Sequence, residues 1–105
     1  MLPTRNGASL LDGCVRSVLE QDAGADELEL VISDNASDDG TADVLAAFAG
    51  DPRLRVLRQP EPLSVTDNWS AALEACRGER ILMIGDDDVL LPGAVRRIFA
   101  LLDEW

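Results

Sequence analysis

The stretch Val31-Ile32-Ser33-Asp34-Asn35-Ala36-Ser37-Asp38-Asp39-Gly40-Thr41 leads from a short apolar run, through an acidic loop, into the start of a helix. Residues 28–33 have the length and composition of a short buried strand. Residues 41–49 repeat apolar side chains at helical spacing, and Gly50-Asp51-Pro52 ends this helix. A buried strand, a polar loop and a helix in this order form the repeating unit of an α/β fold.

The same alternation continues on both sides of this stretch. It predicts helices over residues 9–21, 41–49, 66–77 and from Pro92 onward, strands over residues 28–33, 54–57 and 80–84, and a polar linker at residues 22–27. Residues 3–6 resemble the end of a further strand that is reduced to Met1 and Leu2. Because right-handed crossovers place helices on the faces of a parallel sheet, we expect an α/β, Rossmann-like three-layer parallel sheet with helices on both faces. Residues 1–105 would form one partial domain, truncated at both ends and with unpaired strand edges.

The helices carry further expectations. Ser9 followed by Asp12 is typical of a helix start. The helix over residues 66–77 is expected to turn four residues toward the core, namely Trp69, Ala72, Leu73 and Cys76. The last helix is expected to continue an apolar stripe through Val95, Ile98, Phe99 and Leu102.

The balance of charges limits the partners of this chain. It has 9 basic residues, all of them Arg, against 20 acidic residues, which gives a net charge of -11. Such a chain repels nucleic acid and anionic membrane surfaces. The sequence has no His, so the commonest general base is missing and any acid–base chemistry would fall to carboxylates.

Neither the apolar runs nor the cysteines point to a membrane or a secreted protein. The longest apolar runs are about five residues, against the roughly 20 that cross a bilayer. No basic and then apolar leader opens the chain. Cys14 and Cys76 are too few and too far apart for a disulfide framework, and both fall on predicted apolar helix faces. We therefore expect two reduced core thiols, no membrane span and a cytoplasmic location.

The acidic run Gly85-Asp86-Asp87-Asp88 directly follows the predicted strand at residues 80–84. Three neighbouring carboxylates repel one another, so placing them together at a strand end favours a bound cation, for which a hard divalent metal is the best candidate. In parallel sheets, ligands collect at the carboxyl ends of the strands. Residues 34–40 and 85–88 are both predicted to lie at such ends. The alternative is that the three Asp residues only solvate a loop before Pro92.

Four segments occur in order along the chain: Pro3-Thr4-Arg5-Asn6, residues 31–41, Gly78-Glu79-Arg80-Ile81, and residues 85–88 with Pro92. Together they resemble the nucleotide-sugar-binding half of family 2 glycosyltransferases of the GT-A fold, over nearly the whole chain. The resemblance implies an inverting transferase that moves a sugar from a nucleoside-diphosphate sugar to a saccharide, lipid or protein acceptor. It also implies Mg²⁺ or Mn²⁺ as the cofactor, bridging the diphosphate to the protein.

The resemblance assigns roles to individual residues. It implies nucleotide-sugar binding by Pro3, Thr4, Asn6, Asp34, Asn35, Asn68 and Asp86, and metal binding by Asp87 and Asp88. Asp34 would accept the imide N–H of a uracil-like base, and its alternative role is to cap the next turn. Asp86 would accept a ribose hydroxyl. Asp87 would be the main metal ligand, with Asp88 supporting the metal or its waters.

Some positions depart from the family pattern. Arg5 replaces an aromatic residue, Asn35 stands where a second Asp is common, and Gly85 stands where many relatives carry an Asp. Trp69 is expected in the core, while Asn68 could belong either to the core or to the donor site. Arg5 and Gly85 therefore remove the aromatic contact and one supporting carboxylate of the family pattern.

Other polar residues near the motifs have two interpretations. Asp38, Asp39 and Gly40 would cap the following helix, with direct ligand contact as the alternative. Arg58 and Arg77 would be surface or ion-pair residues, with phosphate binding as the alternative.

In that family, the acceptor-binding residues and the catalytic base lie downstream of the metal motif. The catalytic residue is therefore unknown from this chain, and we expect the chain to be incomplete for transfer. One alternative is a metal- and nucleotide-binding module without catalysis. A second alternative is an acidic Ca²⁺-binding or protein-interaction domain. The loop at residues 34–40 fits a calcium loop poorly, because Ala36 stands where a ligand is required and no Glu follows at the twelfth position. A sugar nucleotidylyltransferase would need a basic, Gly-rich phosphate loop, which Arg5-Asn6-Gly7 does not supply.

Overall fold

The computed structural model describes residues 1–22 and 28–104, so most of the predicted linker at residues 22–27 lies outside the described residues. Within the described residues, three parallel strands form a sheet in the order β1-β2-β3. The strands are β1 (Leu2–Thr4), β2 (Leu30–Asp34) and β3 (Leu54–Arg58). The helices are α1 (Ala8–Leu19), α2 (Thr41–Ala46), α3 (Val65–Ala75) and α4 (Ala94–Asp103). None of these helices is both long and apolar enough to cross a bilayer.

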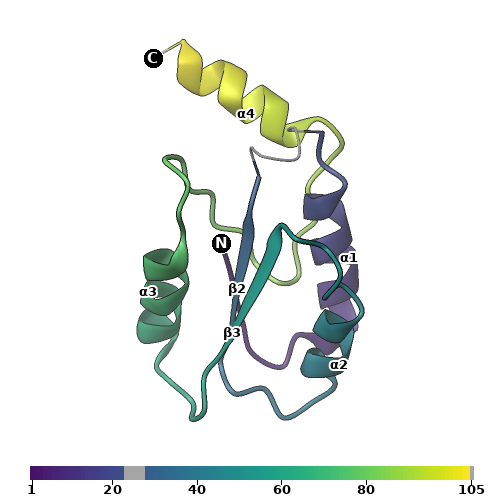
Figure 1. Cartoon of the computed structure of the whole chain (residues 1–105), viewed down its shortest axis with the longest axis vertical. Coiled ribbons are helices and arrows are strands. Elements are labelled where there is room, and N and C mark those ends of the chain that lie inside the picture. Colours follow the sequence, from purple (N-terminus) through teal and green to yellow (C-terminus); the bar gives the residue numbers. More distant parts are fainter. Residues whose placement is uncertain (23–27, 105) are drawn as a thin grey trace.

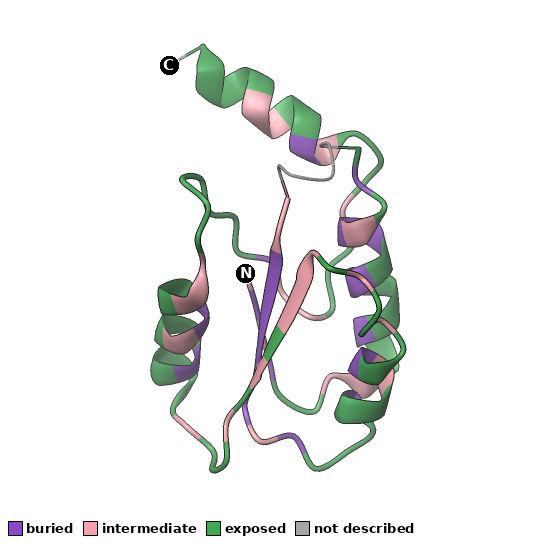
Figure 2. Cartoon of the chain, viewed as in Figure 1, coloured by how far each residue is buried: buried purple, intermediate pink, exposed green. Residues whose placement is uncertain are grey.

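The two faces of the sheet are covered by different helices. Helices α1 and α2 lie together on one face, and α3 lies on the other (Figure 1). Strand β2 is buried throughout its length, and the buried sides of the helices face it (Figure 2). Because side chains alternate along a strand, Leu30 and Ile32 join the core under α1 and α2, while Ser33 contacts α3. The predicted three-layer α/β architecture is confirmed.

The connections place a topological switch point beside β1. The helices α1 and α2 carry the chain from β1 to β2 and on to β3, always in one direction across the sheet. Helix α3 then carries the chain over the opposite face, back past β1, to residues 82–84. The direction of strand progression therefore reverses at β1, and in open α/β sheets the crevice at such a point, outside the carboxyl ends of the strands, is where ligands bind.

The prediction of a strand over residues 80–84 is wrong. These residues are not a strand, and their two backbone bonds to this part of the chain are both made by Met1, the residue before β1: the Met1 amine donates to Leu82 O at 2.6 Å and Ile84 N–H donates to Met1 O at 3.1 Å. The Thr4 carbonyl accepts a hydrogen bond on the side of β2. Because the backbone groups of successive strand residues point to opposite sides, those of Pro3 point toward residues 82–84. A proline has no N–H to donate, which ends the ladder. Of the apolar run, only Ile84 is buried.

The inward face of α3 also differs from the prediction. Trp69 is 43% exposed and Leu73 is exposed as well, so these two predictions are wrong, whereas Ala72 is buried as predicted and Asn68 is buried beside it on this face. The face on the sheet therefore carries small and polar residues instead of large apolar ones. The helix begins at the N-cap Ser64, whose hydroxyl accepts from Asp67 N–H at 3.1 Å. In α4 the predicted stripe is confirmed for Val95, whereas Leu102 is exposed.

Helix α1 begins one residue before the predicted start. Its N-cap is Gly7, which has no side-chain capping bond, so the prediction of Ser9 and Asp12 as the helix start is wrong. The first N–H of the helix, on Ala8, instead donates to Asp39 Oδ2 at 3.2 Å. The cap of α1 therefore comes from a residue 31 positions away, which no local pattern could indicate.

Glu29 joins the end of α3 to the start of β2. Its Oε2 accepts from Arg77 N–H at 2.6 Å and from Gly78 N–H at 3.0 Å, and its Oε1 accepts from the Arg55 side chain at 2.7 Å. Burial by itself would raise the pKa of Glu29, but these hydrogen bonds outweigh it and lower the pKa below the ordinary value of 4.5. The ionised carboxylate therefore stabilises the fold above that pH, and the contribution is lost as pH falls through the lowered pKa.

Glu29→Gln is expected to lower the free energy of unfolding by about 1–2 kcal/mol at neutral pH, because an acceptor of charge-assisted hydrogen bonds loses its charge. The difference from wild type should shrink as pH falls below 4.5, where the carboxyl of the unfolded chain becomes protonated, and vanish once pH falls through the lowered pKa of the folded protein. Urea unfolding at neutral and at acid pH measures both quantities. Glu79→Gln, at an exposed position, is the matched control. A difference that is equal at the two pH values would contradict the role of the charge.

Candidate functional site

The end of β1 meets the acidic run 82 residues further along the chain. Thr4 Oγ1 donates to Asp86 Oδ2 at 2.7 Å, and Thr4 is buried. Gly7 lies against this pair, since a Cβ on Gly7 would stand 2.6 Å from Asp86 Oδ2 and 2.8 Å from Thr4 Oγ1. Any side chain at this position would displace the Thr4–Asp86 pair. The importance of Gly7 was missed from the sequence, because its only signal is a glycine placed just after Thr4-Arg5-Asn6.

Asp87 and Asp88 turn toward a common point beside Gly85. A Cβ on Gly85 would lie 2.8 Å from Asp88 Oδ2 and 3.1 Å from Asp87 Oδ1, so a larger residue there would displace both carboxylates. Asp88 Oδ2 also accepts from Gly85 N–H at 3.1 Å, and Asp88 N–H donates to Gly85 O at 3.0 Å. Two exposed carboxylates therefore converge at the switch point, next to the Thr4–Asp86 pair.

The thiol of Cys14 lies directly beneath the acidic run. It is fully buried, and its Sγ donates to Gly85 O at 3.3 Å. Burial raises the pKa of Cys14 to about 11, with further contributions from the charges of Asp86, Asp88 and Asp87. The thiol therefore stays protonated in the physiological range, as predicted for a reduced core cysteine.

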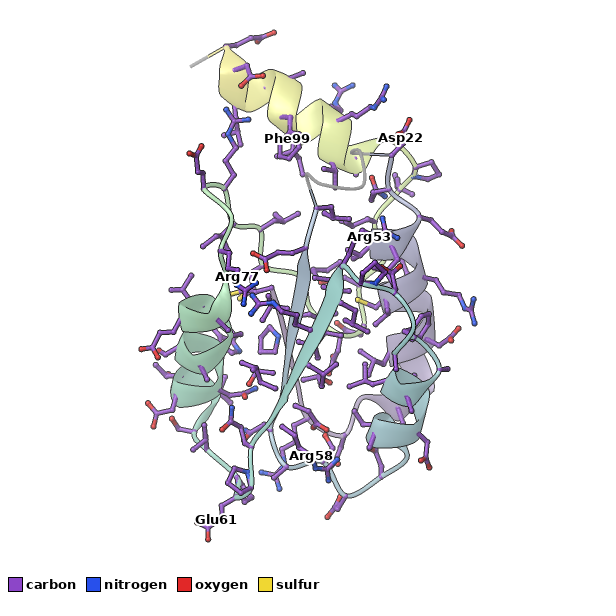
Figure 3. All side chains as sticks on the ribbon, in the orientation of Figure 1. Asp22, Arg53, Arg58, Glu61, Arg77 and Phe99 are labelled. Atoms are coloured by element: carbon purple, nitrogen blue, oxygen red, sulfur yellow. The ribbon has the colours of Figure 1, made fainter. Side chains whose placement is uncertain are left out.

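Asp34 ends β2 and is 1% exposed. Its Oδ1 accepts from Ser37 N–H at 3.1 Å and from the Ser37 hydroxyl at 2.5 Å, so Asp34 does hold the turn that follows it. Its Oδ2 faces the Arg58 guanidinium at 3.5 Å, and Arg58 also donates to Ser37 O at 3.1 Å. Arg58 is therefore an ion-pair residue, which confirms that interpretation. Figure 3 shows it at the carboxyl end of β3, with Arg53 at the opposite end.

A hollow of about 340 Å³ opens beside Asp34 and Arg58. Side chains of α2, of the turn after it and of β3 complete its wall, namely Ala42, Leu45, Ala46, Ala49, Leu54 and Val56. The walls are therefore apolar, while the buried Asp34 carboxylate and the Arg58 guanidinium stand at the carboxyl ends of β2 and β3. Such an arrangement suits a planar, largely apolar group that carries hydrogen-bonding edges.

The loop after β2 is tied to the loop after β1. Asn6 has a positive φ of 53°, its N–H donates to Ser37 Oγ at 2.9 Å, and its Oδ1 accepts from Asp38 N–H at 2.9 Å. Asp39 Oδ1 accepts from Thr41 N–H at 2.9 Å and from the Thr41 hydroxyl, and these bonds lower the pKa of Asp39. Asp39 thus caps the start of α2, as predicted.

Two of the predicted donor-binding amides are used to hold the fold. Asn35 Nδ2 donates to Leu63 O at 2.9 Å and its Oδ1 accepts from Leu63 N–H at 2.7 Å. Asn68 exchanges two bonds with Ser33, at 2.7 Å to the hydroxyl and 3.2 Å to the carbonyl. Both amides are buried. Pro3 takes part through its backbone in β1. The donor-binding roles of these three residues stay predictions.

Across residues 1–22 and 28–104, no group of three or more acidic, Cys or His side chains is arranged to hold a metal ion by itself. This weighs against a protein-only calcium cage at residues 34–40, where Asp34 and Asp39 are occupied by internal hydrogen bonds. It does not exclude a site completed by a ligand. Mg²⁺ typically takes one or two carboxylates and fills the remaining positions with water and phosphate oxygens.

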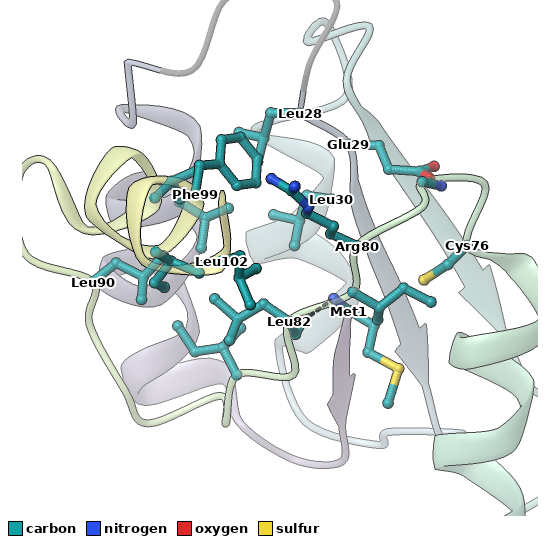
Figure 4. A pocket seen from close by; sticks show the side chains of 16 residues that line it. Met1, Leu28, Glu29, Leu30, Cys76, Arg80, Leu82, Leu90, Phe99 and Leu102 are labelled. Carbon is teal, nitrogen blue, oxygen red and sulfur yellow. Dashed lines mark hydrogen bonds between the residues drawn. The ribbon is translucent and has the colours of Figure 1, made fainter. Parts of the chain in front are cut away.

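A second cavity, of about 160 Å³, lies at the opposite end of the strands, under α4 (Figure 4). Its walls are mostly apolar, including Leu30, Leu82 and Phe99, and the Arg80 guanidinium lies 5.5 Å from the Phe99 ring centre. Within the described residues, its lining includes none of the predicted site residues. The polar site at the carboxyl ends of the strands is therefore separate from this apolar cavity.

Comparisons with known proteins agree with this geometry. The model of the family described as Glycosyl transferase family 2 matches residues 1–105. The chain is 30% identical over 106 residues to the GalNAc(5)-diNAcBac-PP-undecaprenol beta-1,3-glucosyltransferase of Campylobacter jejuni, and this match covers 99% of the chain and 34% of the relative. The chain thus spans about a third of the length of that protein.

Two solved structures are similar in fold. The S. aureus TarS 1-349 structure in complex with UDP superimposes with a TM-score of 0.91 at 24% identity, over 99% of this chain and 31% of TarS. The mannosyltransferase PcManGT from Pyrobaculum calidifontis, in complex with GDP-Man and Mn2+, has a TM-score of 0.77 at 30% identity, over 84% of this chain and 26% of that one. The first likeness shows the fold alone.

Proposed function

Because the chain belongs to glycosyl transferase family 2, we propose that residues 1–105 bind a nucleoside-diphosphate sugar through a divalent metal ion, as the donor-binding part of an inverting glycosyltransferase. The hydrogen bond from Thr4 to Asp86 carries the proposal. It joins the end of β1 to the acidic run at the point where strand progression reverses, and Asn35 N–H bonded to Thr4 O at 2.8 Å brings the Asp34 loop to the same edge.

The carboxylates that we assign to the metal fit a hard cation. Asp87 Oδ1 and Asp88 Oδ2 converge beside Gly85, and oxygen ligands of this kind suit Mg²⁺ or Mn²⁺. A bound ion would neutralise the charge that develops on the diphosphate leaving group. It would also explain how a chain with a net charge of -11 could bind an anion at its most acidic loop.

The chain's own side chains would orient the nucleoside. Thr4 holds Asp86 through Oδ2, which leaves Oδ1 as the atom that we assign to a ribose hydroxyl. At Asp34, Oδ1 is taken by Ser37, and the long 3.5 Å contact of Oδ2 with Arg58 leaves that oxygen as the acceptor for a base imide N–H. The hollow of about 340 Å³ beside Asp34 and Arg58 supports a base at this place.

The complexes of two similar proteins support the class of ligand. TarS is solved with UDP, and PcManGT with GDP-Man and Mn2+. Uracil carries an imide N–H and guanine a lactam N–H on the Watson–Crick edge, and a carboxylate can accept a hydrogen bond from either. We therefore propose a base of this type for the donor.

Titration calorimetry of the chain with UDP, with and without Mn²⁺, tests the proposal. We expect binding that is at least about tenfold tighter with Mn²⁺, because the ion links two carboxylates to the diphosphate. UMP, which lacks the second phosphate, should gain much less from the metal. Equal affinity for UDP with and without the metal would overturn the proposed donor site.

A further inference from the structure

We propose that three side chains, Cys14 and Ser17 of α1 and Gln21 two residues beyond its end, are positioning residues that set the place of the acidic loop at residues 85–88. The proposal rests on the proposed function, since it concerns the geometry of the same donor site. None of the three touches the assigned metal or nucleotide atoms. They would act through the backbone of the segment that carries Asp86, Asp87 and Asp88.

The three residues form a polar stripe on a buried helix face. Their spacing of three and then four residues places them on one side of α1 and its extension. Cys14 is 0% exposed, Ser17 8% and Gln21 6%. A buried polar group costs free energy unless it is hydrogen-bonded, so apolar residues would be the simpler choice for packing alone. Buried polar residues at these three positions therefore need hydrogen-bonding partners.

Each of the three side chains forms a hydrogen bond with the backbone of the segment that follows Ile84. Cys14 Sγ donates to Gly85 O at 3.3 Å. The Ser17 hydroxyl accepts from Leu90 N–H at 3.0 Å while donating to Cys14 O at 2.7 Å, so both its donor and an acceptor site are used. One stripe thus holds the backbone on both sides of the acidic run.

Gln21 extends the stripe to the start of α4. Its Nε2 donates to Leu91 O and to Ser17 O, each at 3.0 Å, and its Oε1 accepts from Val95 N–H at 3.1 Å. Four backbone groups, on Gly85, Leu90, Leu91 and Val95, are therefore fixed by three side chains on one side of α1 and its extension.

The acidic loop needs such support because it lies outside regular structure. Residues 85–93 belong to no helix or strand, and residues 80–84 before them are not a strand either. Besides the turn bond between Asp88 and Gly85, the run is held by Thr4 on one side and by the α1 stripe beneath. A displacement of about 1 Å of a positioned group is enough to lose much of a site's effect. The stripe would thus tune metal affinity without touching the metal.

Ser17→Ala tests the proposal most directly, because it leaves the Leu90 N–H without its partner while removing a single oxygen atom. We expect the affinity for UDP in the presence of Mn²⁺ to fall about fivefold, the equivalent of one net hydrogen bond. The affinity for UDP without metal should not change. Ser9→Ala, the same substitution at an exposed position of α1, is the matched control and should bind as wild type does.

A second readout does not depend on the ligand. The amide resonances of Asp86, Asp87 and Asp88 should shift in Ser17→Ala and stay in place in Ser9→Ala. If these resonances stay in place in Ser17→Ala, or if its binding with Mn²⁺ equals that of wild type, the positioning role is wrong. If wild type shows no metal-dependent binding while the resonances shift as expected, the proposed function fails and the structural link stands.

Cys14 gives an independent pair of variants. Cys14→Ser keeps a donor for Gly85 O and is expected to retain metal-dependent binding, whereas Cys14→Ala removes the donor and should lose part of it. If Ser17→Ala does not fold, these two Cys14 variants test the positioning role in its place. Equal binding by the two Cys14 variants would overturn the positioning role of this residue.

Discussion

Asp87→Asn should abolish the metal-dependent part of nucleotide binding. The substitution keeps the size of the side chain but removes a charge from the two carboxylates that converge beside Gly85. Loss of a partner in the outer shell of a metal site already costs about 10- to 100-fold in affinity. We therefore expect a direct ligand to cost at least about 100-fold, measured as the affinity for UDP in saturating Mn²⁺.

Asp43→Asn, at an exposed position of α2, is the matched control for the change in net charge. It should leave binding unaltered, because Asp43 is exposed and is not one of the residues assigned to the nucleotide or the metal. The melting temperature of Asp87→Asn should stay close to that of wild type, since Asp87 is exposed. Metal-dependent binding of normal strength in Asp87→Asn would contradict the role assigned to this residue.

Asp34→Asn should change which bases the site accepts. In wild type the carboxylate can accept an imide N–H, so UDP should bind more tightly than CDP, whose ring nitrogen at that place is an acceptor. In the variant an amide would stand at the edge of the hollow and could offer a donor instead. Because a hydrogen bond to a charged group is worth about 1.5–3 kcal/mol, the affinity for UDP should fall about 10- to 100-fold.

The ratio of UDP to CDP affinity separates base recognition from simple damage to the loop. Asp34 also holds Ser37, so the variant is expected to lose about 1 kcal/mol of stability as well. Ser37→Ala removes that internal bond and leaves Asp34 Oδ2 in place, so it should weaken stability but preserve the preference for UDP. An unchanged ratio in Asp34→Asn would show that Asp34 serves only to hold the turn.

The sequence predicted the layered α/β architecture because local patterns carry that information. The buried strand ending at Asp34 and the helices after it were recognised from apolar spacing and from glycine and proline stops. The predicted strand at residues 80–84 failed for a different reason. Its apolar pattern was correct, but a strand needs a partner, and its partner is the short β1 with a proline in the middle.

The prediction of which residues of α3 face the sheet failed for a related reason. Large apolar residues at helical spacing pointed to Trp69 and Leu73, yet Asn68 lies on the sheet because its amide pairs with Ser33 across 35 residues. Hydrophobic periodicity cannot anticipate a polar residue that becomes buried by finding a hydrogen-bonding partner elsewhere in the chain.

The sequence by itself determined the chemistry of the candidate site: a carboxylate at the end of a strand and three more after an apolar run, in a chain without histidine or lysine. Only the tertiary structure decided the geometry. It brought Thr4 to Asp86, required glycine at position 7 against that pair, and placed Cys14 and Ser17 beneath the loop. Composition and spacing are local properties that a chain carries into any fold. Contacts between residues some 70 to 80 positions apart exist only once the sheet and its crossovers have closed.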